Sequence, residues 1–182
     1  MSGFRALTPN ININTQSGQL RTELLNTFSR LDGQLSAAPY RLAAQTGPVS
    51  NTGSAETTLM TFKVDNGTMT GLANSILIYA CGQTNANANN KTFKLYLGST
   101  VIFSSGAIAL NNKDWTFQGE IVFSGGQSQI TWGQFTSNGV STIVDVNTST
   151  ENFGNNLTAS FTGQGTATGD ISLAYYKAML LR

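Results

Sequence analysis

The feature that most constrains this chain is a long stretch in which apolar residues occupy every second position. In its first part, Phe93, Leu95 and Leu97 alternate with more polar residues, and the same period recurs from Trp115 to Phe123. A period of two is typical of strands that bury one face. A sheet with one apolar face must cover it with a second sheet or close on itself. The stretch therefore predicts an all-β domain.

Short apolar segments separated by turn residues continue on both sides of this stretch. Asp65-Asn66-Gly67 and Asn138-Gly139 are among the sequences that predict turns or hairpins. We count eight or nine strands, a pattern typical of a β-sandwich or barrel, and place this domain at residues 56–182. The order of the strands does not follow from the alternation, because an immunoglobulin-like sandwich would show the same pattern.

The N-terminal third of the chain has a different pattern. Residues 1–19 are too short and polar to hold a core, and we interpret them either as disordered or as an extended arm that anchors to a partner. Residues 20–38 are rich in helix formers and end before Pro39, so they predict a short helix, and residues 39–55 are interpreted as a linker. The helix either packs on its own domain or forms a coiled-coil stem between identical chains. The apolar residues of the seam are Leu24, Phe28, Leu31 and Leu35.

The composition excludes several classes of function. The chain has no histidine, which removes Ser-His-Asp and Cys-His catalysis and most zinc sites, and its single cysteine allows no internal disulfide. The net charge of +1, with scattered basic residues, argues against a nucleic-acid partner. No apolar run approaches the ~20 residues of a membrane-spanning helix, so we expect no membrane partner. We also expect no cofactor and no bound metal.

A glycosidase would need two carboxylates on either side of a sugar bond, and Glu120 and Asp145 are the pair that could meet across strands. We expect no enzyme, because nothing around these two acids would shift a pKa. Four aromatic residues could stack on sugars, although packing in the core or at an interface is the favoured interpretation. These are Tyr96, Trp115, Trp132 and Tyr175.

The segment from Gln83 to Asn90 lacks an apolar anchor and lies between two strands, so it predicts a loop. One interpretation is a solvated hairpin loop, and the other is an exposed tip that offers amide groups to a sugar or a protein. The candidate ligand residues in this loop are Asn85, Asn87, Asn89 and Asn90.

Several segments taken together resemble a group of bacteriophage virion proteins that carry a C-terminal jelly-roll domain. The segments are Leu77–Gly82, Asn89–Gly98, Trp115–Phe123 and Gln129-Ile130, followed by an Asn-rich stretch before the last strands. Proteins of this group occur as capsid decoration proteins, head fibres or minor tail proteins. The resemblance covers roughly residues 56–181 and specifies the fold better than the role.

The resemblance implies a jelly-roll sandwich of eight or nine antiparallel strands and a structural role in the virion, made in the cytoplasm of the host bacterium. The chain would be a homotrimer joined by the helical seam and attached to the major capsid protein or another virion protein by its arm. Phe4, Ile11 and Ile13 are the apolar residues of that arm. The alternatives are a receptor-binding tail fibre or tip that contacts a host surface glycan, and a cellular carbohydrate-binding module.

Overall fold

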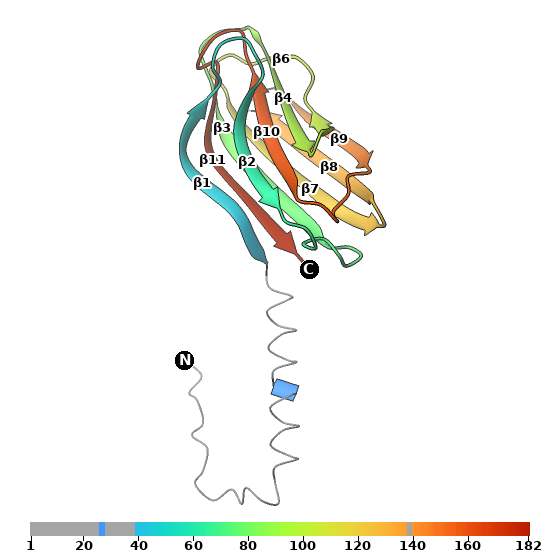
Figure 1. Cartoon of the computed structure of the whole chain (residues 1–182). Coiled ribbons are helices and arrows are strands. Elements are labelled where there is room, and N and C mark those ends of the chain that lie inside the picture. Colours follow the sequence, from blue (N-terminus) through green and yellow to red (C-terminus); the bar gives the residue numbers. More distant parts are fainter. Residues whose placement is uncertain (1–25, 28–38, 138–139) are drawn as a thin grey trace, which may run out of the picture. The chain divides into compact units, whose positions relative to one another are not determined.

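The computed structural model describes residues 26–27, 39–137 and 140–182, and the side chains of residues 140–142 are not part of that description (Figure 1). The chain divides into two units, residues 1–38 and 39–182. In the first unit only Asn26 and Thr27 are described, and both are helical. The part of the chain that the structure describes contains no helix long and apolar enough to cross a membrane.

The second unit is built from antiparallel strands. Eleven strands are described in it. They are β1 (Tyr40–Ser50), β2 (Thr57–Val64), β3 (Ser75–Thr84), β4 (Asn90–Leu97), β5 (Thr100–Ser104), β6 (Ile108–Ala109), β7 (Asp114–Gly125), β8 (Ser128–Ser137), β9 (Val140–Ser149), β10 (Leu157–Gln164) and β11 (Ile171–Leu181).

The strands form two sheets packed face to face (Figure 1). The larger sheet has the order β1-β11-β3-β7-β8-β9, and the smaller has the order β2-β10-β4-β5 with β6 beside β4. The first four strands of the larger sheet, set against the smaller one, have the interleaved order of a jelly roll, in which the first and last strands of the chain are neighbours. β8 and β9 extend the larger sheet beyond that arrangement. The predicted all-β jelly-roll sandwich is therefore confirmed.

The core between the sheets is made by the alternating residues from which the fold was predicted. Phe93 and Trp115 are at most 1% exposed, and their rings lie 5.1 Å apart between centroids. Phe135 and Phe161 complete the cluster, with ring centroids 4.5 and 6.1 Å from Phe93. Burying each such side chain stabilises the fold by about 1.5–3 kcal/mol. Gly82 lies against this cluster, and a Cβ there would collide with the Ser172 carbonyl group and the Trp115 ring.

The prediction of a linker over residues 39–55 is wrong, because residues 40–50 form strand β1. β1 pairs with β11 from Tyr40 opposite Leu180 to Ser50 opposite Ser172, with irregular register around Gly47-Pro48. A Gly-Pro sequence is compatible with a strand at the edge of a sheet, where one side of the backbone needs no partner. The jelly roll thus begins at Tyr40 rather than at Glu56.

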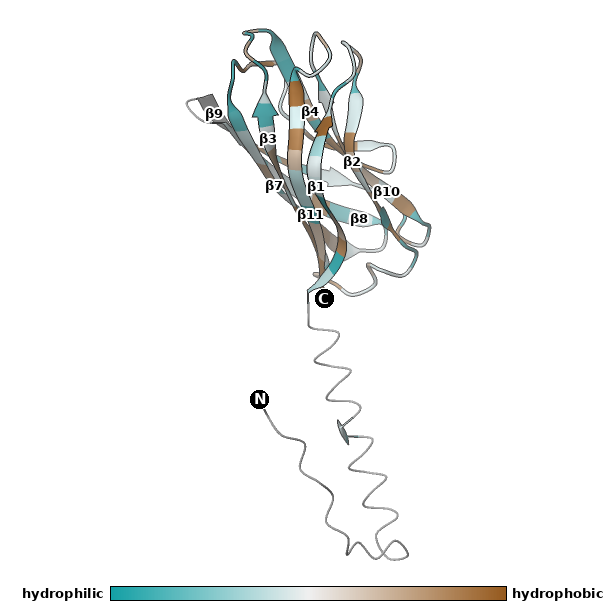
Figure 2. Cartoon of the chain, turned by 90° about the vertical axis from the view of Figure 1, so that its left-hand side faces the viewer, coloured by the Kyte–Doolittle hydropathy of each residue, from teal (hydrophilic) through white to brown (hydrophobic). Residues whose placement is uncertain are grey.

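The count of eight or nine strands is also corrected, since β1 and the two-residue strand β6 are added. Neither strand alternates regularly, and each pairs with a neighbour: β1 with β11, and β6 with β4. Figure 2 shows the domain from the side of β1 and β11, where apolar and polar segments are mixed along the strands.

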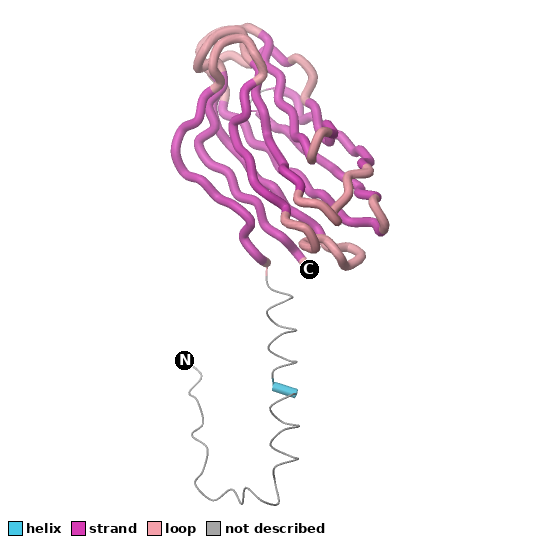
Figure 3. The backbone as a smooth tube through the Cα atoms, in the orientation of Figure 1, coloured by secondary structure: helices cyan, strands magenta, loops and turns pink. Residues whose placement is uncertain are grey.

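The chain enters and leaves the sandwich at the same end. Tyr40 is paired with Leu180, so the start of β1 lies beside the end of β11. The loops that connect β1 to β2, β3 to β4 and β10 to β11 gather at the opposite end (Figure 3). We call the end at which these three loops gather the loop end of the sandwich.

Candidate functional site

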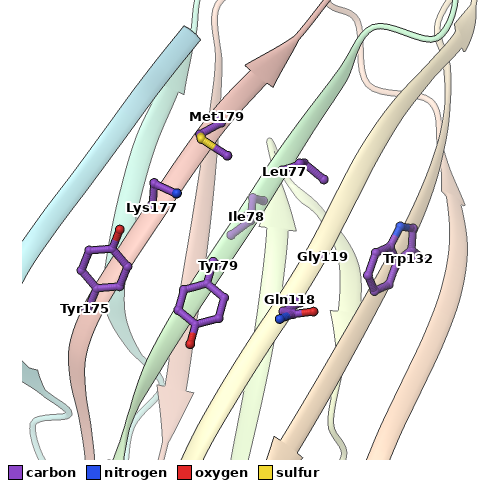
Figure 4. A pocket seen from close by; sticks show the side chains of 9 residues that line it. All are labelled: Leu77, Ile78, Tyr79, Gln118, Gly119, Trp132, Tyr175, Lys177 and Met179. Atoms are coloured by element: carbon purple, nitrogen blue, oxygen red, sulfur yellow. The ribbon is translucent and has the colours of Figure 1, made fainter. Parts of the chain in front are cut away.

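A groove of about 440 Å³ lies on the outer face of the larger sheet, across strands β11, β3, β7 and β8 (Figure 4). This face points away from the core, so the groove is open to solvent. The residues that line it are Leu77, Ile78, Tyr79, Gln118, Gly119, Trp132, Tyr175, Lys177 and Met179.

The register of the sheet brings these side chains together from strands that are far apart in the sequence. Tyr79 on β3 lies opposite Lys177 on β11 and opposite Gln118 on β7. One step along the strands, Leu77 lies opposite Met179. Because residues opposite each other in an antiparallel pair point to the same face, these side chains form one continuous surface.

The aromatic side chains of the groove are held in place by neighbours. The Trp132 indole donates a hydrogen bond from Nε1 to Oε2 of Glu120 at 3.1 Å. The rings of Tyr79 and Tyr175 lie 6.1 Å apart between centroids at an angle of 53°. Burial raises the pKa of Tyr79, and so does the neighbouring Cys81 thiol. Like any tyrosine with a pKa of about 10 or above, Tyr79 keeps its hydroxyl proton at neutral pH and can donate a hydrogen bond.

The groove carries a cation without an ionic partner. Within the described residues the one salt bridge joins Lys94 to Glu56 at 2.7 Å, and both belong to the smaller-sheet side of the sandwich. Lys177 forms no such pair among those residues and lines the groove half-buried. Its ammonium group is therefore available to a ligand.

Two of the four aromatic residues considered as sugar-stacking candidates lie in this groove, namely Trp132 and Tyr175. Trp115 is 1% exposed in the core, as the favoured interpretation expected. Tyr96 lies on β4, in the smaller sheet, close to the Lys94 ammonium. Sequence reasoning did not single out Tyr79, which lies within an apolar run.

The structure separates the two acids considered for a glycosidase. Glu120 lies opposite Trp132, and Trp132 lies opposite Val146, so these three share the outer face. Asp145 is the neighbour of Val146 on β9 and therefore points to the other face of the sheet. Its carboxylate accepts a hydrogen bond from the Asn147 amide at 2.8 Å. The two acids cannot act on one bond. No metal-binding cluster of acidic or Cys side chains is found in the described ranges.

The candidate ligand loop is used mainly for internal contacts. Asn87 donates to Oδ1 of Asp170 at 2.6 Å and accepts from the Lys91 ammonium at 2.6 Å. The Asn89 amide donates to the Thr166 hydroxyl at 2.7 Å. The Asn85 side chain accepts from the next backbone N–H, and Asn90 is the first residue of β4. Asn87 has both ends of its amide occupied, so it could bind a ligand only by breaking this network.

The network is centred on two buried charges at the loop end. Lys91 is 0% exposed and Asp170 is 1% exposed. The Lys91 ammonium donates to the Asn87 side chain and to the backbone carbonyls of Asn87 and Asn89. Asp170 accepts from the backbone N–H groups of Thr166 and Ala167. The two charges thus brace the loop between β3 and β4 against the loop between β10 and β11.

A third loop joins the network through Asn51, which is 0% exposed. Its amide donates to the carbonyl of Ala167 at 2.9 Å, and its side-chain oxygen accepts from the N–H of Ile171. The connection after β1 is therefore attached to the same loop as Asp170. Sequence reasoning did not find this network, since a lysine inside an Asn-rich segment predicts a solvated loop.

The ionisation of Asp170 makes the stability of the fold depend on pH. Burial would raise the pKa of this carboxyl, but the hydrogen bonds from Thr166, Asn87 and Ala167 outweigh burial and lower the pKa to about 2. The unfolded value is about 3.9. The contribution of Asp170 is therefore fully present above about pH 4 and is lost as the pH falls toward the folded pKa. Burial lowers the pKa of Lys91, and the charge of Asp170 opposes that shift.

We expect the free-energy difference between wild type and Asp170→Asn to be largest above about pH 4 and to shrink toward pH 2. Urea unfolding at a series of pH values measures it. A difference that stays constant over this range would show that the carboxylate charge does not contribute to stability. Asp65→Asn is the control, because it makes the same exchange at an exposed turn.

The predicted stem and arm residues lie outside the described residues. Those of the stem are Leu24, Phe28, Leu31 and Leu35, and those of the arm are Phe4, Ile11 and Ile13. The trimer and the anchoring function stay predictions.

No protein-family model matches the chain, and no curated protein matches it. Among solved structures, the chain is similar to the marine PL-14 alginate lyase from Aplysia kurodai, with a TM-score of 0.41, 9% identity and coverage of 74% of this chain and 81% of that one. It is also similar to the CBM2 module of the evolved Dit of Lactobacillus casei BL23 phage J-1, with a TM-score of 0.32, 10% identity and coverage of 79% and 96%. A structure of infectious bursal disease virus, Gx strain, aligns with a TM-score of 0.27, 17% identity and coverage of 80% and 42%.

Proposed function

We propose that this chain is a non-enzymatic structural protein of a bacteriophage particle, a capsid decoration protein or head fibre that forms a homotrimer. The observation that carries the proposal is the jelly-roll strand order, because the resemblance implied this order and an immunoglobulin-like sandwich would have contradicted it. The segments that carry the resemblance fall on β3, β4, β7 and β8.

The two ends of the sandwich support this role. Residues 1–38 join the domain at Tyr40, and the braced loops lie at the other end. A chain held to a particle by residues 1–19 would thus be tethered through Tyr40, at the end of the sandwich opposite the loop end. The partner of these residues would be the major capsid protein or another virion protein.

Trimerisation would give the attachment its strength. A helix as short as residues 20–38 is marginal in water when isolated, so a seam of Leu24, Phe28, Leu31 and Leu35 would need partner helices. Three linked arms would bind a particle surface much more tightly than one arm, because each binding event raises the effective concentration for the next.

Light scattering on the full chain and on a version that begins at Tyr40 tests the proposal. We expect the full chain to be a trimer and the truncated version to be a monomer, because the truncation removes the proposed stem. The truncated version should still fold, because it retains every described strand of the sandwich. A trimer that survives truncation would place the contact in the jelly roll and contradict the stem. A monomer in both cases would contradict the trimer altogether.

A further inference from the structure

The groove on the outer face of the larger sheet has the properties of a ligand site. Its volume of about 440 Å³ falls within the range of roughly 300–1,000 Å³ typical of such sites. Apolar and aromatic side chains form most of its lining, and Gln118 and Lys177 add a few polar groups. The residues come from four strands of a rigid sheet, so their relative positions are fixed before any ligand binds.

The aromatic rings of the groove are suited to flat ligands with apolar faces. Figure 4 shows the rings of Tyr79 and Trp132 on either side of Gln118, with Tyr175 beside Tyr79. The hydrogen bond to Glu120 holds Trp132, and Tyr175 packs against Tyr79. Tyrosine and tryptophan offer a large contact area with little loss of conformational entropy, together with a polar group at the edge of the ring.

The charges around the groove favour a neutral ligand rich in hydroxyl groups. Lys177 donates hydrogen bonds, the Glu120 carboxylate accepts them, and Gln118 can do both. Glu120 lies opposite both Leu77 and Trp132, at the border of the groove. Glu120 would repel an anion and Lys177 would repel a cation. The hydroxyl groups of a neutral ligand can accept a hydrogen bond from Lys177 and donate one to Glu120.

A second copy of the chain fits this groove less well. Packing a protein face over it would bury Lys177, which has no ionic partner among the described residues, and an unpaired buried charge is costly. A sugar chain lying in an open groove would leave the ammonium group accessible to water. The exposed apolar residues next to the groove, Val144 and Val146 on β9, are not part of its lining.

From the rings, the polar groups and the charge balance together, we propose that this groove binds the pyranose rings of a neutral polysaccharide. The pyranose rings stack on Tyr79 and Trp132, and the sugar hydroxyl groups form hydrogen bonds with Gln118, Lys177 and Glu120. This site differs from the Asn-rich loop considered from the sequence, whose amides are engaged internally. The inference does not depend on the proposed role in a virion, since a monomer of any origin with this face would bind in the same way.

Tryptophan fluorescence of the full chain tests the inference, because Trp115 is buried in the core and Trp132 lines the groove. The probes are hexasaccharides of glucose, galactose, mannose and N-acetylglucosamine. We expect at least one of them to change the emission with saturation in the millimolar range or below. Tyr79→Ala and Gln118→Leu should weaken that binding about tenfold, the loss of one well-placed contact.

Val144→Thr is the matched control, because Val144 is exposed on the same face but lies outside the groove lining. It should bind as wild type does. Absence of any saturable change with all four hexasaccharides would overturn the inference, and so would binding that Tyr79→Ala and Gln118→Leu leave intact. The other possible occupant is a second copy of the chain, and light scattering on the same variants tests for it. If the wild type associates and both groove variants do not, the groove is an interface between copies. Failure of the trimer test, by contrast, would leave sugar binding unaffected.

Discussion

A version of the chain that begins at Glu56 is expected to aggregate or to lose cooperative unfolding, whereas a version that begins at Tyr40 remains folded. The Glu56 version loses the eight residue pairs between β1 and β11, the core contacts of Leu42 and Val49, and the buried amide of Asn51. At about 0.5–1.5 kcal/mol for each main-chain hydrogen bond, their loss removes several kcal/mol, a large share of the 5–15 kcal/mol that stabilises a typical domain. The truncation also uncovers the edge of β11, which becomes a template for pairing with other chains. Urea unfolding followed by fluorescence, with light scattering, measures both effects.

The two versions differ only in residues 40–55, so each is the control for the other. A cooperative transition of equal midpoint in both would contradict a structural role for β1 and restore these residues as a linker. Leu42 and Val49 pack against the core from β1, and a double change of these two to Ser should destabilise the Tyr40 version in the same direction but by less. That variant keeps the main-chain pairing with β11, so it separates packing from pairing.

The alternation in the middle of the chain was sufficient to predict the sandwich, because those residues bury one face against the other sheet. Phe93, Leu95, Trp115 and Phe117 are all at most 2% exposed. β1 was missed for a physical reason. An edge strand needs only one neighbour and a partly buried face, so its sequence can contain a Gly-Pro bulge and little apolar periodicity.

The outer face could not be predicted, because the alternation on β8 and β9 is inverted. On β8 the apolar Ile130 and Trp132 point outward, while Gln129 and Thr131 are at most 1% exposed. The inner polar groups are satisfied by hydrogen bonds: Gln129 donates to the Glu151 carbonyl, and Thr131 to the Ile102 carbonyl. Periodicity alone identifies two faces but not which of them is buried, and only the register of β8 with β7 and the packing against the smaller sheet decide it.

The substitution Asp170→Ala is expected to destabilise the domain by about 2 kcal/mol, because the buried Asp170 carboxylate accepts several hydrogen bonds that join two loops. It leaves the N–H groups of Thr166 and Ala167 and the amide of Asn87 without their acceptor, and because Thr166 and Ala167 are exposed, water replaces part of these bonds. A hydrogen bond to a charged group contributes about 1.5–3 kcal/mol, and Lys91 would in addition lose the opposite charge of Asp170. Urea unfolding at neutral pH gives the change in free energy.

The substitution of Lys91 decides how the two charges cooperate. Lys91→Met removes the ammonium but keeps an apolar stem of similar length, so alone it should cost less than Asp170→Ala, which strands several donors. Because Asn87 bonds to both charges, the effects of the two substitutions should not add, and the double variant should be more stable than the sum of the single losses predicts. Asp65→Ala, at an exposed turn, should stay within about 0.5 kcal/mol of wild type. Strict additivity of the two substitutions would mean that Lys91 and Asp170 stabilise their loops independently, and that the loop end is not one braced unit.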